Sequence, residues 1–400
     1  MHILYHHRTA GDRVELVHIM GMVRALRQMG HTVDICSPPG CDPERTAPNR
    51  KGSARRNGTL RTRLKRFARR APPILFEGAE LSYNLYSLAQ MTRLFRRRRP
   101  DLLYERATAN SIAPTLLARR WGVPIVQEVN VTADVGRLRP LVLGDLTRRI
   151  ERWVGRRADL VVTVSEEFRR RLAASGYPAE RALICQNAAD PDVFGPDAVE
   201  PAQRPPNVPS DAVLVGYVGA FVPWHRPDLL VEAARRLASG YPEARWLLVG
   251  DGVARPRIEE LLGRWGLTDR FWMPGAVPHR AVPSYLAAMD AAVLPDSNQF
   301  GSPMKLFEYM SMARAVVAPR VPAVCEVLND EEQGLLFEPG GVSSLCAALE
   351  RVLGDAPLRE RLGRSARRHV LRNYTWRRNA ERVLSALGLA PERRMEGNRE

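Results

Sequence analysis

Short apolar runs recur along the chain and alternate with longer stretches in which apolar residues return every three or four positions. The first such stretch lies between apolar runs at residues 3–5 and 32–36. Its apolar positions at helical spacing are Leu16, Ile19, Met20, Val23 and Leu26. Further runs occur at residues 102–104, 125–129, 160–164, 182–185, 213–218, 246–250, 271–273, 291–294 and 315–317. The runs predict buried strands and the stretches between them predict helices, so the chain is expected to be an α/β protein with doubly wound parallel sheets.

A proline-rich segment at residues 196–209 interrupts this alternation once and is predicted to be an interdomain linker. Four hundred residues exceed what one simple core usually holds, which favours two domains. We expect domains at residues 1–195 and 210–375, facing each other across a cleft. A final helix at residues 376–390 is expected to cross back to the first domain, and residues 391–400 are expected to be disordered.

Composition narrows the setting of the protein. No run of eighteen apolar residues occurs, and the amino terminus lacks the layout of a signal peptide, so no membrane span is predicted. The five cysteines are scattered and show no C-x-x-C spacing, which argues against a zinc site and a disulfide framework. The simplest expectation is a cytoplasmic protein.

The net charge of +16 is unevenly distributed, with arginine clusters at residues 55–70 and 96–99. Nucleic acid, an anionic membrane surface and an anionic substrate would each suit this charge, and so would a general arginine bias without any partner. No C2H2, KH or RNP pattern is present, so a nucleic-acid partner is not predicted. Residues 74–94 form a helical pattern rich in Leu, Phe and Tyr. This helix either packs on a sheet or lies on a membrane surface as a peripheral contact.

The stretch at residues 300–310 holds the strongest candidate for chemistry. Gly301, Ser302 and Pro303 predict a tight loop that leads into a buried helix carrying Lys305 and Glu308 one turn apart. Predicted strands flank this segment, and ligands of such units bind at the carboxyl ends of the strands. A helix start with a lysine suits a nucleotide diphosphate. The alternative is a Lys305–Glu308 surface pair on an ordinary core helix.

Several segments in this order resemble family-4 retaining glycosyltransferases of the GT-B fold, and the resemblance covers nearly the whole chain. It implies two Rossmann-like domains, an acceptor domain followed by a nucleotide-sugar donor domain. The segments that carry it are Gly30–Val33, Asn187–Phe194, Val218–His225, Leu247–Gly252, Met273–Val277 and the block from Phe300 to Glu308, which matches the family's E-x7-E helix with Glu308 as the second acid.

The chain departs from the family pattern at three positions. Phe300 stands where the family has the first acid of E-x7-E, and Asp296 or Asn298 is a candidate replacement. Ala220 and His225 stand where the family has its diphosphate-binding arginine and lysine. The compensating charges are expected from Lys305 and Arg226.

The resemblance assigns roles to named residues. Donor binding is expected from Gly11, Gly219, His225, Arg226, Val277, Gly301, Ser302, Lys305 and Glu308. Glu308 would hold the ribose hydroxyls, and Val277 would face the nucleobase. His225 would lie near the phosphates, and its alternative role is to cap the following helix. The catalytic candidates are Lys305, Glu128 and Asn130, with a purely structural pairing of Glu128 and Arg106 as the alternative for Glu128.

The expected activity is transfer of a sugar from a nucleotide-diphosphate sugar to a hydroxyl, with retention of configuration by front-face displacement. No cofactor or metal is expected, because the D-x-D spelling of Asp190–Asp192 lies beside the predicted linker, where a turn is the simpler interpretation. Three alternatives remain for the role of the protein. They are synthesis of a bacterial surface polysaccharide on a lipid-linked acceptor at the inner membrane face, transfer to a soluble small molecule, and a catalytically idle nucleotide-binding protein.

Overall fold

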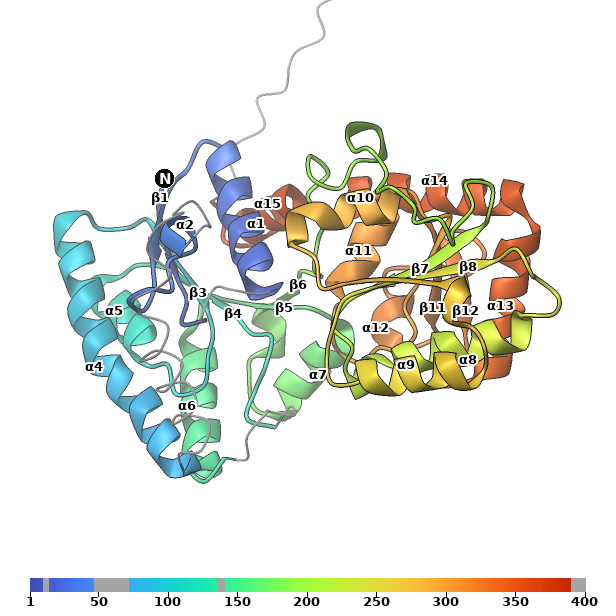
Figure 1. Ribbon diagram of the computed structural model, residues 1–400. Helices are drawn as coiled ribbons and strands as arrows, with labels where there is room; N and C mark the ends of the chain where they lie inside the picture. The colour runs from blue at the N-terminus through green and yellow to red at the C-terminus, as the bar shows by residue number, and fades with distance from the viewer. Residues whose placement is uncertain (10–13, 47–71, 135–140, 390–400) are drawn as a thin grey trace, which may run out of the picture. The chain divides into compact units, whose positions relative to one another are not determined.

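The computed structural model describes residues 1–9, 14–46, 72–134 and 141–389, and Figure 1 shows the path of the chain. The chain divides into two compact units. The first contains Met1–Val164, Phe168–Cys185 and the residues from Asn379 onward, and the second contains Ser165–Glu167 and Gln186–Arg378. The predicted tail at 391–400 and the basic cluster at 55–70 lie outside the described residues.

The first unit is built on six parallel strands, at the positions that the apolar runs predict. They are β1 (His2–His6), β2 (Thr32–Cys36), β3 (Leu102–Arg106), β4 (Ile125–Glu128), β5 (Leu160–Thr163) and β6 (Ala182–Ile184). Their order in the sheet is β2-β1-β3-β4-β5-β6. The chain therefore starts near the middle of the sheet and moves first to one side and then to the other, which is the doubly wound arrangement.

The helices of the first unit are α1 (Val14–Gln28), α2 (Pro43–Thr46), α4 (Pro73–Arg97), α5 (Ala113–Trp121) and α6 (Gly144–Arg157). Most of α7 (Glu166–Ala174) and most of α15 (Trp376–Ala386) also belong to this unit. On one face of the sheet, Leu4, Leu103 and Ile125 pack against Met91 and Phe95 of α4. The helix predicted at residues 74–94 is thus confirmed as α4. Its inner side packs against the sheet.

The outer side of α4 carries large apolar side chains that are exposed: Ile74, Leu75, Phe76, Leu85, Tyr86 and Leu88. Leu85 is 73% exposed and Leu75 is 62% exposed. The sequence left two alternatives for this helix, packing on the sheet or lying on a membrane surface. Since the inner side packs and the outer side stays apolar, the observed packing does not remove the second alternative. Among the described residues, no helix is both long enough and apolar enough to span a membrane.

The second unit has the same doubly wound architecture. Its strands are β7 (Leu214–Val218), β8 (Arg245–Val249), β9 (Phe271–Gly275), β10 (Ala291–Val293), β11 (Ala315–Pro319) and β12 (Gly334–Phe337), all parallel, in the order β12-β11-β10-β7-β8-β9. Two doubly wound sheets, as predicted, are therefore present in the chain.

Helices cover both faces of the second sheet: α8 (Pro227–Leu237), α9 (Arg255–Arg264), α10 (Val282–Ala287), α11 (Met304–Ser311), α12 (Pro322–Cys325), α13 (Val342–Gly354) and α14 (Ala356–Asn373). Figure 1 shows α8 and α9 on one side of this sheet and α10 and α11 on the other. Leu230 of α8 belongs to the core on the first side, whereas Leu306 and Phe307 of α11 belong to the core on the second. The helix predicted around Lys305 is therefore α11, and its apolar stripe is buried as expected.

The proline-rich segment at 196–209, predicted to be a linker, is hydrogen-bonded to the second unit. The guanidinium of Arg204 donates to the carbonyls of Pro209, Ala212 and Ala288, at 2.9, 2.9 and 3.0 Å. The N–H of Ala202 donates to the carbonyl of Ser284. Proline content indicated an irregular backbone correctly, but it carries no information on whether such a backbone is anchored.

The strand order creates one switch point in each unit. A doubly wound sheet has a crevice where two neighbouring strands send their following segments to opposite sides, and ligands bind there. In the first unit this switch point lies between the carboxyl ends of β1 and β3, and in the second it lies between those of β7 and β10.

A buried carboxylate ties α4 to the start of α6. Glu77 is 2% exposed, and its two oxygens accept the backbone N–H groups of Val142 (2.7 Å) and Leu143 (2.8 Å). Both N–H groups precede Gly144, the first residue of α6, so they find no partner within the helix. Glu77 thus caps the segment that leads into α6.

We expect Glu77→Ala to destabilise the first unit by about 2 kcal/mol, since it leaves two N–H groups without an acceptor. Hydrogen exchange of the Val142 and Leu143 amides should accelerate in this variant. Ser82→Ala, on the exposed side of the same helix, serves as the matched control and should leave both amides unchanged. Equal exchange rates in the two variants would contradict the capping role.

Candidate functional site

The loop after β7 approaches α11 so closely that it needs a glycine. A Cβ added at Gly219 would lie 2.5 Å from the Tyr217 hydroxyl and 2.7 Å from Lys305 Nζ. A Cβ added at Gly250, after β8, would lie 1.9 Å from the Gly219 carbonyl oxygen. The carboxyl ends of β7 and β8 are therefore packed backbone to backbone, and Lys305 lies directly against Gly219.

Lys305 is a cation with little around it to balance its charge. Its ammonium donates to the Tyr217 hydroxyl (3.2 Å) and lies 4.7 Å from the centre of the Tyr217 ring. Among the described residues, no carboxylate comes within ion-pair distance of it. Burial lowers the pKa of Lys305 to about 8, although the Glu308 carboxylate one turn away acts in the opposite direction. The ammonium is thus held at the switch point of the second unit at a cost in solvation.

His225 lies beside Tyr217 and is neutral. Its Nδ1 lies 3.1 Å from the carbonyl of Ala220 and 3.2 Å from the Tyr217 hydroxyl. Burial, followed by the Lys305 ammonium, lowers the pKa of His225 to about 4. A neutral ring that donates from Nδ1 to the carbonyl has its lone pair on Nε2. Gly219, His225 and Lys305, together with Tyr217, are therefore brought together by the fold, and we call these four residues the Lys305 cluster.

Arg226 faces a different partner. It begins α8 with a left-handed backbone (φ 47°), and its guanidinium pairs with Asp228 at 3.4 Å. The structure thus places Arg226 next in sequence to the Lys305 cluster but pairs its charge with a carboxylate of α8. The alternative role weighed for His225, capping of this helix, finds no support, because α8 has no side-chain cap hydrogen bond.

The loop before α11 is held by its own side chains. Asn298 Oδ1 accepts the N–H groups of Phe300 (3.1 Å) and Gly301, and a Cβ at Gly301 would lie 2.7 Å from that oxygen. The Ser302 hydroxyl accepts the N–H of Asn187 (2.9 Å). The Gly301 N–H and Ser302 hydroxyl, both predicted to bind the donor, are thus already bonded within the protein. Asn298, proposed as a replacement for the first acid, is used in the same way.

Glu308 is nearly buried and has one partner. His279 Nε2 lies 3.0 Å from Glu308 Oε1, and the ring of His279 packs edge-on against Phe194 at 5.5 Å. The hydrogen bond to Glu308 raises the pKa of His279 above its usual value. Glu308 Oε2 has no hydrogen-bond partner among the described residues. Val277, two residues before His279, is half-buried on the same side of the sheet as α11.

Sequence reasoning missed Tyr217 and His279. Tyr217 lies inside the apolar run of β7 and reads as an ordinary core residue, since only the three-dimensional packing brings its hydroxyl to Lys305. His279 follows the segment Met273–Val277 that carries the family resemblance, so its position just past a strand end was an available signal. Asp190, on the other hand, forms the predicted turn, with its Oδ1 accepting the N–H of Asp192 (3.2 Å).

In the first unit, Glu128 lies at the centre of a buried network. Its Oε1 accepts from Arg106 and from Asn130 Nδ2 (2.7 Å), and its Oε2 accepts from the Tyr104 hydroxyl (3.1 Å). Burial would raise the pKa of Glu128, but His18 and Arg106 together with these hydrogen bonds hold it below its usual range. The pairing with Arg106 that the sequence offered as an alternative is therefore observed. Gly11, the remaining candidate in this unit, lies outside the described residues.

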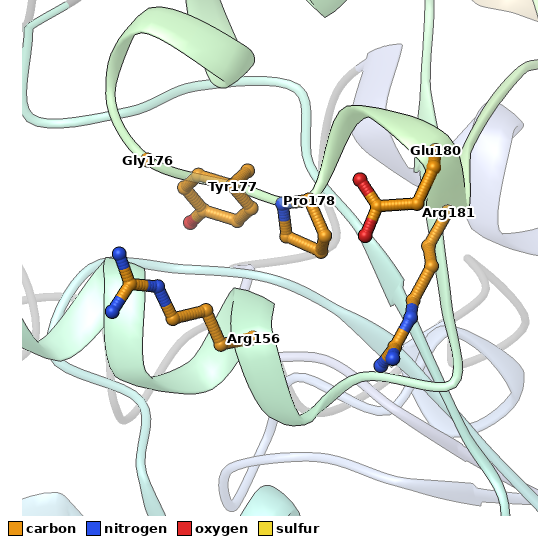
Figure 2. Close-up of a pocket in the computed structure, with 6 residues that line it drawn as sticks. All are labelled: Arg156, Gly176, Tyr177, Pro178, Glu180 and Arg181. Atoms are coloured by element: carbon orange, nitrogen blue, oxygen red, sulfur yellow. The ribbon is translucent and has the colours of Figure 1, made fainter.

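A surface hollow of about 430 Å³ lies elsewhere in the first unit, and Figure 2 shows its lining. It is lined by Arg156, Gly176, Tyr177, Pro178, Glu180 and Arg181. The Tyr177 hydroxyl and the Arg156 guanidinium are on one side of the view, and Glu180 and Arg181 are on the other (Figure 2). This hollow lies where α6 ends and β6 begins, at the amino-terminal edge of the sheet. It contains none of the predicted site residues.

The sequence matches two family models that follow one another along the chain. Residues 16–188 match the glycosyl transferase 4-like domain, and residues 212–355 match the glycosyl transferases group 1 model. Among solved structures, the chain resembles sucrose-phosphate synthase from Thermosynechococcus elongatus, with a TM-score of 0.70, 18% identity and coverage of 97% of this chain and 98% of that one. It also resembles Anabaena HepE in complex with UDP, with a TM-score of 0.67, 15% identity and coverage of 97% and 100%. These likenesses show the GT-B fold.

Curated relatives are closer in sequence. The D-inositol 3-phosphate glycosyltransferase of Stackebrandtia nassauensis is 30% identical over 74% of this chain and 69% of its own length. The alpha-D-kanosaminyltransferase of Streptomyces kanamyceticus is 28% identical over 64% of this chain and 68% of its own. With the paired family models and the two doubly wound units, these matches establish that the chain belongs to the group 1, family-4 glycosyltransferases and is a glycosyltransferase of the GT-B fold.

Proposed function

We propose that the protein transfers a sugar from a nucleotide-diphosphate sugar to a hydroxyl of an acceptor, and that Lys305 binds and stabilises the leaving diphosphate. The observation that carries this proposal is the Lys305 ammonium at the β7/β10 switch point, with a phenol and a glycine beside it and no carboxylate within ion-pair distance among the described residues. A desolvated cation without a counter-charge is costly unless a ligand supplies the negative charge. A diphosphate is such a ligand.

The neighbours of Lys305 suit this task. Tyr217 accepts a hydrogen bond from the ammonium and fixes its position, so it acts as a positioning residue. The bare backbone of Gly219 lets phosphate oxygens approach the ammonium, because no Cβ fills the space. His225 Nε2, as a neutral acceptor, can receive a hydroxyl of the donor and take up a proton once a diphosphate lies beside it. Developing negative charge on the leaving oxygens is stabilised most where water is excluded.

Glu308 is proposed to bind the ribose. Its Oε1 is held by His279, which fixes the carboxylate and leaves Oε2 able to accept from ribose hydroxyls. Val277 would place backbone groups beside the nucleobase. Solved neighbours described as complexes with UDP and with UDP-glucose support a nucleotide-sugar donor.

Retention is proposed to proceed by front-face displacement, in which the acceptor hydroxyl attacks from the side on which the diphosphate leaves. The hydrogen bonds that Glu128 already makes support this route. Both of its oxygens are occupied by Arg106, Asn130 and Tyr104, so it is poorly placed to act as a nucleophile. We propose that Glu128 and Asn130 are positioning residues of the first unit and that no metal ion takes part.

Two classes of acceptor suit this activity. The names of the curated relatives, which include a D-inositol 3-phosphate glycosyltransferase and a 2-deoxystreptamine glucosyltransferase, favour a small polyol. The exposed apolar side of α4 favours a lipid-linked acceptor at an anionic membrane surface, as in synthesis of a surface polysaccharide.

Replacing Lys305 by methionine keeps the volume of the side chain and removes its charge. We expect turnover to fall by roughly a hundredfold or more, because one stabilising donor at the reacting oxygens is lost. The same variant should be more stable than the parent at pH 7, on the order of 2 kcal/mol, since a charge that burial disfavours is removed. Donors are found by screening UDP-, GDP-, ADP- and TDP-sugars for thermal stabilisation, followed by a transfer assay.

Arg264→Met, on the exposed side of α9, is the matched control and should change neither quantity. The assay is run in EDTA because the proposal requires no divalent cation. Unchanged turnover in Lys305→Met would remove the lysine from the mechanism, and complete loss of parental activity in EDTA would overturn the metal-free route.

Binding of the free nucleoside diphosphate should weaken as pH rises above about 8. The pKa of Lys305 in the unliganded protein is about 8, whereas a bound diphosphate favours the protonated form and raises this pKa. The complex therefore holds more protons than the free protein in this range, and affinity is expected to fall by up to about tenfold per pH unit. His225, with a pKa of about 4, does not titrate there in the free protein. Titration calorimetry from pH 6.5 upward measures the profile, and Lys305→Arg, which stays protonated, should flatten it.

Membrane association is tested on α4 itself. If the apolar side of this helix contacts lipid, the protein should sediment with anionic vesicles at low salt, and Leu75→Glu with Leu85→Glu should reduce the bound fraction several-fold. Leu116→Glu, at an exposed leucine on α5, is the control. No sedimentation of the parent protein at low salt would favour the soluble polyol.

A further inference from the structure

The surface hollow of Figure 2, which we call the Tyr177 hollow, lies at the amino-terminal edge of the first sheet. It is formed by the end of α6 and by residues 176–181, which lie between α7 and β6. Substrates of doubly wound sheets bind at the opposite edge, beyond the carboxyl ends of the strands. None of the six lining residues takes part in the proposed donor site, so a ligand here would occupy a second, separate site.

The shape of the Tyr177 hollow is set by the backbone. A Cβ added at Gly155 would lie 2.3 Å from Tyr177 Cδ1, so the tyrosine ring packs directly on the backbone of α6. Gly176 adopts a left-handed backbone (φ 88°), which glycine accepts without steric cost. Pro178 restricts the backbone two residues further on. The concavity therefore rests on two glycines, a proline and one packed aromatic ring.

Three arginines surround this concavity. Arg156 and Arg181 line it, and a Cβ added at Gly176 would lie 2.9 Å from Arg152 Cδ and 3.9 Å from Arg156 Nη2. Arg152 donates to the carbonyl of Arg148 (3.4 Å), and Arg181 donates to that of Ala158 (3.3 Å). In the part of the chain that the structure describes, none of the three has a carboxylate within ion-pair distance, and Arg156 makes no hydrogen bond.

Arginines elsewhere on the surface are paired. On α9, Arg255 lies 2.7 Å from Glu259, and Arg264 lies 2.7 Å from Glu260. Asp159, the carboxylate that follows α6, is paired with Arg119 of α5 (3.1 Å). The three arginines at the Tyr177 hollow differ from these, because their charges converge on one concave surface without a counter-charge. Such a surface attracts an anion.

Two polar groups in the lining are also unused. Tyr177 is only 6% exposed, and its hydroxyl has no hydrogen-bond partner among the described residues. In Figure 2 this hydroxyl lies on the same side as the Arg156 guanidinium, and Glu180 lies on the other. Burial raises the pKa of Tyr177, so its hydroxyl stays protonated and can donate. Glu180 forms no ion pair within the described residues and can accept. Since buried polar groups are nearly always hydrogen-bonded, the free hydroxyl indicates a ligand.

We propose that the Tyr177 hollow binds a small organic phosphate that also carries hydroxyl groups. Arg156 and Arg181 bind the phosphate, because guanidinium and phosphate form charge-assisted hydrogen bonds. Tyr177 donates to a phosphate oxygen, and Glu180 accepts from a hydroxyl of the same ligand. The volume of about 430 Å³ lies within the range of about 300–1,000 Å³ that is usual for small-molecule sites. The assignment does not depend on the proposed transferase function.

The test titrates the full chain with ribose 5-phosphate and glycerol 3-phosphate, each compared with its unphosphorylated parent and with inorganic phosphate. We expect at least one of the two organic phosphates to bind roughly tenfold or more tightly than either comparison compound. Hydrogen exchange should slow at residues 150–158 and 176–184 when this compound is bound. The affinity should be unchanged in Lys305→Met, which separates this site from the proposed donor site.

Substitutions in the lining identify the role of each group. Arg156→Gln and Arg181→Gln should each weaken binding of the organic phosphate roughly tenfold, and Tyr177→Phe should weaken it several-fold. Both arginine side chains are exposed, so these variants are expected to keep the fold. Arg149→Gln, at an exposed arginine two turns earlier on α6, is the matched control and should change nothing.

Glu180→Gln gives the sharpest result. It removes a negative charge that repels phosphate, so inorganic phosphate should bind more tightly. It also removes a strong acceptor for the hydroxyls, so the advantage of the organic phosphate over inorganic phosphate should shrink. A basic surface without a built site would show the first effect and not the second.

Three results would overturn the proposal. They are failure of both organic phosphates to bind the parent protein, equal losses in Arg149→Gln and Arg156→Gln, and slowed exchange at segments other than 150–158 and 176–184. An advantage of the organic phosphate that persists undiminished in Glu180→Gln would remove Glu180 from the site. Loss of binding in Lys305→Met would place the ligand in the proposed donor site and refute this inference alone.

Discussion

The half-buried ammonium of Lys305, with no carboxylate within ion-pair distance among the described residues, is the constraint on which the proposed donor site depends. Strand order brings the end of β7 beside the loop that follows β10, so Lys305 must point at the backbone of Gly219. Tyr217 supplies a hydroxyl and an aromatic face in place of a carboxylate. A carboxylate beside the ammonium would neutralise the charge that the proposed anionic ligand needs.

The choice of lysine is itself informative in this chain. Of its 60 basic residues only three are lysines, Lys51, Lys65 and Lys305, and Lys305 is the one that the structure describes. Arginine remains charged at any accessible pH and presents a wide planar fork, whereas an ammonium is compact and shifts its pKa readily. The compact ammonium of Lys305 lies against Gly219 and Tyr217. In a chain with so strong an arginine bias, a lysine at this position indicates that the size and titration of the group matter there.

Sequence alone could predict the strands, the doubly wound plan and the place of Lys305 at the start of a buried helix. These follow from periodicity and from the order of the elements. It could not predict that Gly301 and Ser302 are bonded to Asn298 and Asn187, since those partners are chosen by tertiary packing. Tyr217 was missed for the same reason. Its neighbours in sequence are apolar, and its hydroxyl acquires meaning only from a helix more than eighty residues away. The segment at 196–209 has the composition of a linker but is bonded to the second unit through Arg204.

Other cations of the described residues show how a charge can be balanced inside the protein. Arg106 is paired with Glu128, and Arg314 donates to three backbone carbonyls. Lys305, beside the switch point of the second sheet, has a phenol next to it and no carboxylate within ion-pair distance in the part of the chain that the structure describes. A neutral side chain of similar size would fill the same place without the cost of removing a charge from water, so packing alone does not account for the lysine. The proposed diphosphate would supply the negative charge that this arrangement lacks, so that the substrate completes an electrostatic balance that the protein alone leaves open.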